Sequence, residues 1–254
     1  MIVERLPLPR AADLRRIALF SELSIADLDR ILPTLCARSF RRGSTLILRD
    51  DFQRRVCFVW SGSYRLVIAA PPRKIVLVRY LKRGGSFGHL PAISDANLDE
   101  QMRIACDEDG LVLEMDAEQF AGFRREMPAL EEAILVALSA IAADQASRIF
   151  ELLTLSARER VQAELLRLAR AGDWQGKCSI VRPAPTRQVL ADQVGATREG
   201  VTRILSALAD ESLIRVDRGV IEVLDIDRLL ALDEAATGRR MFDLTKATDL
   251  EDQR

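Results

Sequence analysis

Three charged residues stand close together in the second half of the chain, in a pattern that suits hydrogen bonding to DNA bases. Arg198, Glu199 and Arg203 occupy positions i, i+1 and i+5, so on a helix they would share the exposed half near its N-terminal end. Arginine can donate two hydrogen bonds to N7 and O6 of guanine, and glutamate can accept one from N4 of cytosine. The pattern predicts base recognition, and the alternative is an ordinary solvated helix face.

The residues around this set predict two short helices joined by a tight turn, over 186–208. Thr186 and Thr197 can each cap a helix through the side-chain hydroxyl, and Gly195 can adopt the left-handed backbone that ends the first helix. The second helix would bury one apolar stripe, formed by Val201, Ile204, Leu205 and Leu208. The segment is therefore expected to be a helix-turn-helix, whose second helix enters the major groove of DNA.

The overall charge excludes a protein that binds nucleic acid through bulk positive charge. The 254 residues carry 37 basic and 38 acidic side chains, a net charge of −1, and the length allows two domains. Any contact with DNA must come from a local patch. Residues 186–218 hold five arginines and five acidic residues, so these arginines must converge on one face. If they do not, the alternative is a regulator that works mainly through protein partners.

Cysteine and histidine usage excludes several chemistries. The four cysteines form no C-x-x-C pair, which argues against a metal site of the zinc-ribbon or ordinary iron–sulfur kind, and we expect buried, reduced thiols. With a single histidine, most acid–base schemes lack a participant, so we expect no enzyme activity. No apolar run approaches the ~18 residues of a membrane span, and no signal peptide is evident, so we expect a cytoplasmic protein without membrane contact.

The first half of the chain predicts a β-roll. Residues 12–35 predict short helices, and the short apolar runs that follow are bounded by Gly, Pro, Asp or Ser, which is typical of a jelly roll. The predicted strands are 40–48, 56–60, 64–68, 75–80 and 111–115.

A long helix over 127–153 is expected between the roll and the DNA-binding part. Its apolar seam has a repeat close to 3.5 residues and includes Ile134, Leu138, Ile141, Gln145 and Ile149. Such a narrow seam indicates a coiled coil between two copies of the chain. The alternative is a helix that packs on its own sandwich.

The segments after the long helix complete the predicted α+β organisation. A helix at 156–171 leads into the helix-turn-helix, a hairpin turning at Arg218-Gly219 forms a wing, and a short helix follows at 225–232. The predicted domains are a β-roll sensor domain at 1–126, a dimerisation helix at 127–155, a winged helix-turn-helix at 156–232 and a charged tail at 233–254.

From Leu19 to Leu224 the chain resembles the cyclic-AMP receptor protein/FNR family of bacterial transcription regulators. The matching segments are 19–24, 40–43, 59–66, 84–90, 186–188 and 197–203. The resemblance implies a cyclic-nucleotide-binding-like β-roll, a homodimer on a palindromic site, a half-site similar to TGTGA and contact with RNA polymerase. It also implies roles for single residues: Arg198, Glu199 and Arg203 read bases, while Arg187, Gln188 and Thr197 contact phosphates.

The chain departs from this family where nucleotide-binding members hold the phosphate. His89 stands in place of a glutamate, and Glu100-Gln101-Met102 stands in place of an Arg-Ser/Thr-Ala triplet. A glutamate would repel a phosphodiester, and Gln145 replaces a hydroxyl residue that touches the base, so cyclic AMP is not expected to bind. The candidate effector pocket is His89, Arg103 and Gln145. These residues name no cofactor; a haem ligated by His89, or a redox-linked sensor, remains the alternative.

Overall fold

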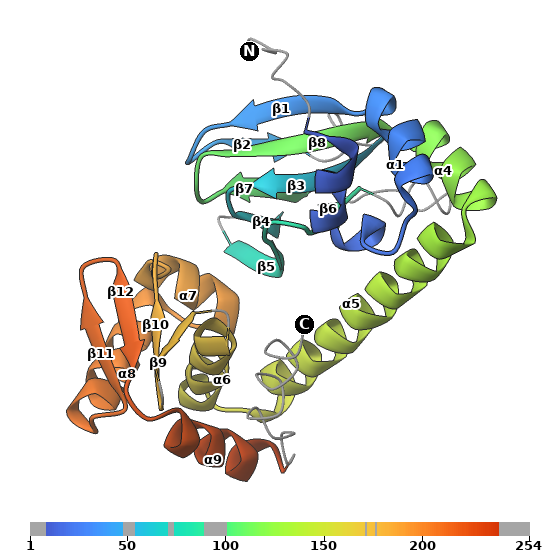
Figure 1. The fold of residues 1–254 in the computed structure, drawn as a ribbon. Helices are drawn as coiled ribbons and strands as arrows, with labels where there is room; N and C mark the ends of the chain where they lie inside the picture. The colour runs from blue at the N-terminus through green and yellow to red at the C-terminus, as the bar shows by residue number, and fades with distance from the viewer. Residues whose placement is uncertain are drawn as a thin grey trace. The chain divides into compact units, whose positions relative to one another are not determined.

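The computed structural model describes residues 9–47, 54–70, 74–88, 101–170, 172–175 and 177–238. The chain forms two compact units, Met1–Gln145 and Ala146–Arg254 (Figure 1). The boundary between them falls inside the long helix α5 (Pro128–Thr154). Each unit is described by itself.

The first unit opens with the short helices that the sequence predicted. They are η1 (Ala11–Arg16), η2 (Ala18–Phe20), α1 (Ile25–Ile31) and η3 (Leu32–Thr34). Ser24 caps α1, because its hydroxyl accepts a hydrogen bond from the Asp27 amide at 3.1 Å. Leu14, Phe20 and Leu28 are fully buried, so these short helices contribute to the core of the unit.

Within the described residues, eight strands then form a β-roll of two antiparallel four-stranded sheets. The sheet orders are β1-β8-β3-β6 and β2-β7-β4-β5. The strands are β1 (Cys36–Phe40), β2 (Thr45–Ile47), β3 (Arg55–Ser61), β4 (Tyr64–Ala70), β5 (Lys74–Leu81), β6 (Ser86–Phe87), β7 (Met102–Cys106) and β8 (Gly110–Asp116). The jelly-roll prediction is confirmed, but the strand predicted at 40–48 is two strands. Gly43, with φ of 83°, lies in the turn that separates β1 from β2.

Two helices close the roll, and the sequence analysis missed the first of them. Helix α4 (Ala117–Glu126) follows β8 directly, and the Asp116 carboxylate caps it by accepting from the Glu118 amide at 2.8 Å. Phe120 of α4 is fully buried against Phe58, with ring centroids 6.1 Å apart. The free cysteines Cys57 and Cys106 are buried as expected, whereas Cys36 is exposed, because it begins an outer strand of its sheet.

Helix α5 packs one side against its own β-roll. Leu130 and Ile134 are buried in the roll core, and Leu138 packs against the same core. Further along this side, Gln145 donates from Nε2 to the carbonyl oxygen of Val78 in β5 over 2.9 Å. Of the predicted seam residues, Ile134 is buried in its own unit and cannot face a second copy, whereas Leu138 and Gln145 are half-buried and each contact their own unit on one side.

The other side of α5 is apolar and exposed. Ile141 is half-buried in the same row as Ile134 and Leu138, but Ile149 has 58% of its surface exposed. Leu135 and Leu153, at 55% and 80%, are exposed as well. We call the residues at alternating spacings of four and three on this side the outer stripe; they are Leu135, Ser139, Ala142, Ala146, Ile149 and Leu153. The outer stripe lacks a partner among the described residues.

The apolarity of α5 also changes the membrane expectation. Among the described residues, α5 is the one helix that is long enough and apolar enough to cross a membrane, judged by length and composition alone. The sequence analysis expected no such run. The helix nevertheless carries Asp144 and Arg148, which are costly in hydrocarbon. Its first turns are also buried in the roll core.

The second unit is a winged helix-turn-helix with one further helix. Its elements are the last turns of α5, then α6 (Ala157–Arg170), β9 (Asp173–Gln175), β10 (Cys178–Val181), α7 (Arg187–Val194), α8 (Arg198–Asp210), β11 (Ile214–Asp217), β12 (Val220–Val223) and α9 (Ile226–Thr237). The strands form one antiparallel sheet in the order β11-β12-β10-β9 (Figure 1). The predicted wing is confirmed as β11 and β12, and the sequence analysis missed β9 and β10. Helix α9 continues five residues beyond the predicted end at 232.

Candidate nucleic-acid interface

Two capped helices form the helix-turn-helix. The Thr186 hydroxyl accepts a hydrogen bond from the Val189 amide at 3.2 Å at the start of α7, which ends at Gly195 with φ of 60°. The Thr197 hydroxyl accepts from the Gly200 amide at 3.1 Å at the start of α8. These contacts satisfy amides that a helix N-terminus leaves open. Both predicted caps and the predicted left-handed glycine are confirmed.

Helix α8 separates an apolar side from a charged one. Val201, Leu205 and Leu208 are buried in the core of the unit. Arg198, Glu199 and Arg203 are exposed, and no ion pair or side-chain hydrogen bond holds them among the residues that the structure describes. Three hydrogen-bonding groups are therefore displayed on one helix without an internal partner, which base recognition in the major groove requires.

The residues predicted to contact phosphates lie in or next to the first turns of the two helices. Arg187 and Gln188 open α7 and are exposed, and Gln188 donates to Asp192 Oδ1 at 2.9 Å. Thr197 precedes α8, and its cap uses the hydroxyl oxygen as acceptor, so the hydroxyl proton is available to a further acceptor. The positive ends of helix dipoles attract phosphate at such positions.

A groove of about 440 Å³ lies between these helices and the wing. Arg187 of α7 and Arg198 of α8 line it, together with Asp217 and Gly219 of the wing. The wing turn is tied to the start of the motif, because the Ala184 amide donates to the Gly219 carbonyl at 2.9 Å. The wing and the helix-turn-helix thus share one concave surface.

Ion pairs neutralise some of the charged side chains of residues 186–218 and leave others available. Arg215 is paired with Glu222 at 2.7 Å on the wing, and Glu211 is paired with Arg158 of α6 at 2.7 Å. Arg187 and Arg198 line the shared groove. Two of the five arginines, Arg187 and Arg198, therefore converge on one surface as required. Arg215 does not add to its positive charge, because Glu222 neutralises it on the wing.

The predicted effector pocket stays a prediction, because only two of its three residues are described. His89 and Glu100 lie outside the described residues. Arg103 is half-buried in β7 and donates to the Met102 carbonyl at 2.9 Å, whereas Gln145 bonds to β5. Strand β4 lies between β7 and β5. The backbones of β7, which carries Arg103, and of β5, to which Gln145 bonds, are therefore about 10 Å apart at the usual strand spacing.

Sequence reasoning missed several charged groups that the described residues bury, among them the half-buried Arg79 and the buried Glu164. Arg79 of β5 donates to the Ser86 carbonyl at 2.7 Å, and burial lowers the pKa of its guanidinium, which Asp144 partly offsets. Glu164 of α6 has only 1% of its surface exposed, and burial raises the pKa of its carboxyl in spite of Arg167. For Arg79 the available signal was a charged residue on the face of a strand that otherwise alternates as buried, whereas Glu164 lies on a helix and gave no such signal.

Family comparisons agree with this architecture. A model of the cyclic nucleotide-binding domain matches residues 37–126, and a model of the Crp-like helix-turn-helix domain matches residues 159–232. The first match covers the strands of the β-roll and α4, and the second covers most of α6 and continues into α9. Each match falls within one of the two units.

Named relatives align with most of the chain. The chain is 28% identical over 193 residues to the cAMP-activated global transcriptional regulator Vfr of Pseudomonas aeruginosa, covering 74% of this chain and 89% of Vfr. It is 28% identical over 224 residues to the cyclic AMP receptor protein of Thermus thermophilus, covering 87% and 97%. The structure of a CooA mutant from Carboxydothermus hydrogenoformans shares the fold, with a TM-score of 0.71, 19% identity and coverage of 90% and 99%. The chain therefore belongs to the cyclic-AMP receptor protein/FNR family of DNA-binding transcription regulators.

Proposed function

We propose that this chain is a cytoplasmic, homodimeric regulator that binds a palindromic DNA site and controls transcription there. The observation that carries the proposal is the exposed side of α8, where Arg198, Glu199 and Arg203 lack side-chain partners within the described residues. Guanine and cytosine edges supply the acceptors and the donor that these groups need. Arg187, Gln188 and Thr197 would fix the register by contacting phosphates.

The outer stripe of α5 supports the homodimer. Leu135, Ala142, Ala146 and Ile149 are exposed at spacings of seven, four and three residues, which is the repeat of a two-stranded coiled coil. Small alanines in the middle would let two such helices approach closely. Two copies joined in this way would place their recognition helices about 34 Å apart, in successive major grooves.

The β-roll is the proposed sensor or partner-contact domain. RNA polymerase is the expected protein partner by family resemblance, and the effector is a molecule other than cyclic AMP. Two alternative functions are compatible with the same fold: a haem- or redox-linked sensor, and a regulator that works mainly through protein partners. A DNA-binding experiment distinguishes the second alternative from the proposed function.

Selection of duplexes from a random pool by the full chain tests the proposal. We expect an inverted repeat that contains guanine, with half-site centres about one helical turn apart. Affinity for the selected site should exceed that for random DNA by about 10³ or more at physiological salt. Recovery of no repeat, with equal binding to all duplexes, would favour the partner-based alternative.

Cyclic AMP is expected to leave the protein unchanged, although Vfr and the Thermus thermophilus relative are named for it. The sequence offers Glu100 where the family places arginine, and the Gln145 amide already donates to Val78. A ligand at a hundredfold excess over its Kd stabilises the folded state by about 2.7 kcal/mol. Millimolar cyclic AMP should therefore shift neither the melting temperature nor the affinity for the selected site.

Cyclic GMP under identical conditions serves as the control for nonspecific nucleotide effects. A reproducible thermal shift with cyclic AMP alone would contradict the prediction. So would a tenfold gain in affinity for the selected site.

A further inference from the structure

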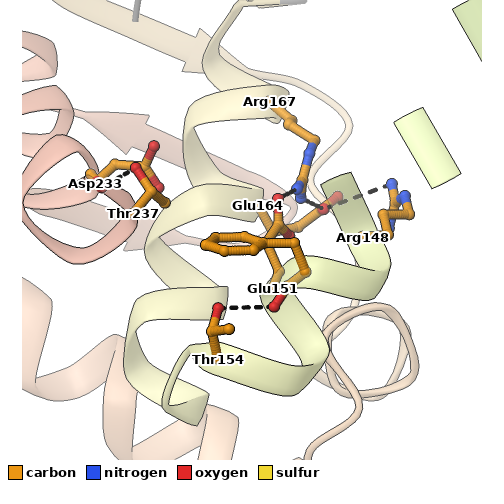
Figure 2. A network of polar contacts seen from close by, with 8 residues as sticks. Arg148, Glu151, Thr154, Glu164, Arg167, Asp233 and Thr237 are labelled. Atoms are coloured by element: carbon orange, nitrogen blue, oxygen red, sulfur yellow. Dashed lines mark hydrogen bonds and ion pairs between the residues drawn. The ribbon is translucent and has the colours of Figure 1, made fainter. Parts of the chain in front are cut away.

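Four charged residues form a cluster where the last turns of α5 meet α6. Glu164 of α6 accepts from Arg167 Nη1 at 2.7 Å and lies 3.9 Å from Arg148 Nη2 of α5. Arg167 also pairs with Glu151 of α5 through its second terminal nitrogen (Figure 2). Arg167 thus holds one carboxylate from its own helix and one from α5. We call these four residues the α5–α6 clamp.

The clamp is largely removed from water. The side chains of Glu164, Arg148, Glu151 and Arg167 are 1%, 12%, 15% and 26% exposed. Burying charges costs about as much free energy as their pairing returns, so such a cluster adds little net stability over apolar residues of the same size. The hydrogen bonds of a paired arginine instead constrain geometry, because the planar guanidinium fixes the angle at which each carboxylate binds.

The same joint is connected to the turn of the helix-turn-helix. Arg160 of α6 donates to the carbonyl of Leu155, just after α5, and to the carbonyl of Val194 at the end of α7, both at 2.6 Å. Leu152 of α5 packs beside Gly195, and a Cβ at that glycine would lie 3.1 Å from its Cδ2 atom. The end of α5 therefore contacts the element that precedes the recognition helix.

Helix α9 borders the clamp from a third direction. Asp233 of α9 is 8% exposed, and its carboxyl interacts electrostatically with Glu151, Arg167 and Arg170. Thr237 holds the last turn of α9 through a hydrogen bond to the Asp233 carbonyl at 2.8 Å (Figure 2). The three helices thus meet around one group of charges.

We propose that Glu151 and Arg167 are positioning residues, which act through the α5–α6 clamp to hold α8 at a fixed angle to the end of α5. The inference rests on the proposed function, because an angle matters only when two recognition helices must reach two half-sites together. With the clamp intact, the dimer accepts one half-site spacing. With the clamp broken, each half still binds its own half-site, but the pair tolerates other spacings.

The test uses the full chain and the variants Glu151→Gln, Arg167→Met and the double variant. Binding is measured on the selected palindrome, on palindromes with one base pair added or removed at the centre, and on an isolated half-site. We expect each single variant to lose tenfold or more on the palindrome and to reduce the penalty for altered spacing. Half-site affinity should stay within twofold, and the double variant should be no worse than the weaker single one.

Arg158→Met is the matched control, because Arg158 also lies on α6 but pairs with Glu211 in an exposed contact. It should bind every duplex like the unchanged protein. Unaltered spacing preference in Glu151→Gln and Arg167→Met would overturn the inference, and so would an equal loss on the half-site, which indicates a damaged domain. Failure of the proposed function is visible separately, as absence of sequence preference in the unchanged protein.

Discussion

Ile149→Glu is expected to convert the protein into monomers and to abolish binding to the palindromic site. Ile149 is 58% exposed on α5 and belongs to the outer stripe, where it would face its symmetry mate in the proposed coiled coil. A glutamate there would be buried opposite a second glutamate, which costs several kcal/mol. Sedimentation should show monomers. Circular dichroism should stay unchanged, because the residue contributes little to the core of its own unit.

Ile25→Glu provides the matched control for this variant. Ile25 is the first residue of α1 and is 44% exposed, so the same substitution adds the same charge at a comparable exposure away from the outer stripe. The control should remain dimeric and bind the palindrome normally. Undiminished dimers of Ile149→Glu would contradict the proposed interface, and half-site binding by the monomer would show that the DNA-binding unit is intact.

Local chemistry made the helix-turn-helix predictable from the sequence. The hydroxyls of Thr186 and Thr197 cap their helices, and Gly195 takes the left-handed backbone. Each of these features depends on contacts within a few residues, so the sequence alone specifies it. The same holds for the wing, where Gly219 adopts φ of 72° in the turn between β11 and β12.

The sequence could not predict which side of α5 packs on the β-roll, because apolar residues occur on both sides of the helix. Ile134 and Leu135 are neighbours in the sequence, yet Ile134 is 3% exposed and Leu135 is 55% exposed. A periodic pattern identifies a face but not its partner. The roll needed one face for its own core, and that tertiary contact buries the predicted seam residue Ile134.

Strand β6 of the roll and the burial of Glu164 in the second unit were missed because the sequence carries little local signal for either. Strand β6 has two residues and pairs with β3 at Cys57 and Phe58 only, so its sequence carries no period. The buried Glu164 looks like a surface residue in the sequence: Arg167, three residues on, would also pair with it on an exposed helix face, and its other partner, Arg148, belongs to a different helix. Long-range pairing of this kind leaves no local signal.

Arg203→Ala is expected to lower specific affinity and leave nonspecific binding nearly intact. Arg203 is exposed on α8 without a side-chain partner among the described residues, so its removal should cost the fold little. A bidentate contact with guanine contributes about 1–3 kcal/mol of discrimination. Quantitative footprinting should therefore show a loss of roughly tenfold to a hundredfold on the selected palindrome, with relaxed preference at one base pair of each half-site.

Arg187→Ala is the informative comparison, because Arg187 also lies exposed in the same unit but is proposed to contact a phosphate. Its loss should weaken binding to the palindrome and to random DNA alike, and should reduce the salt dependence of binding by about one counterion. The two variants are thus expected to differ in which duplexes they bind less tightly, rather than in how much affinity they lose. If Arg203→Ala behaved like Arg187→Ala, with equal losses on both duplexes, Arg203 would be a phosphate contact. Sequence would then be read from α8 by Arg198 and Glu199 alone.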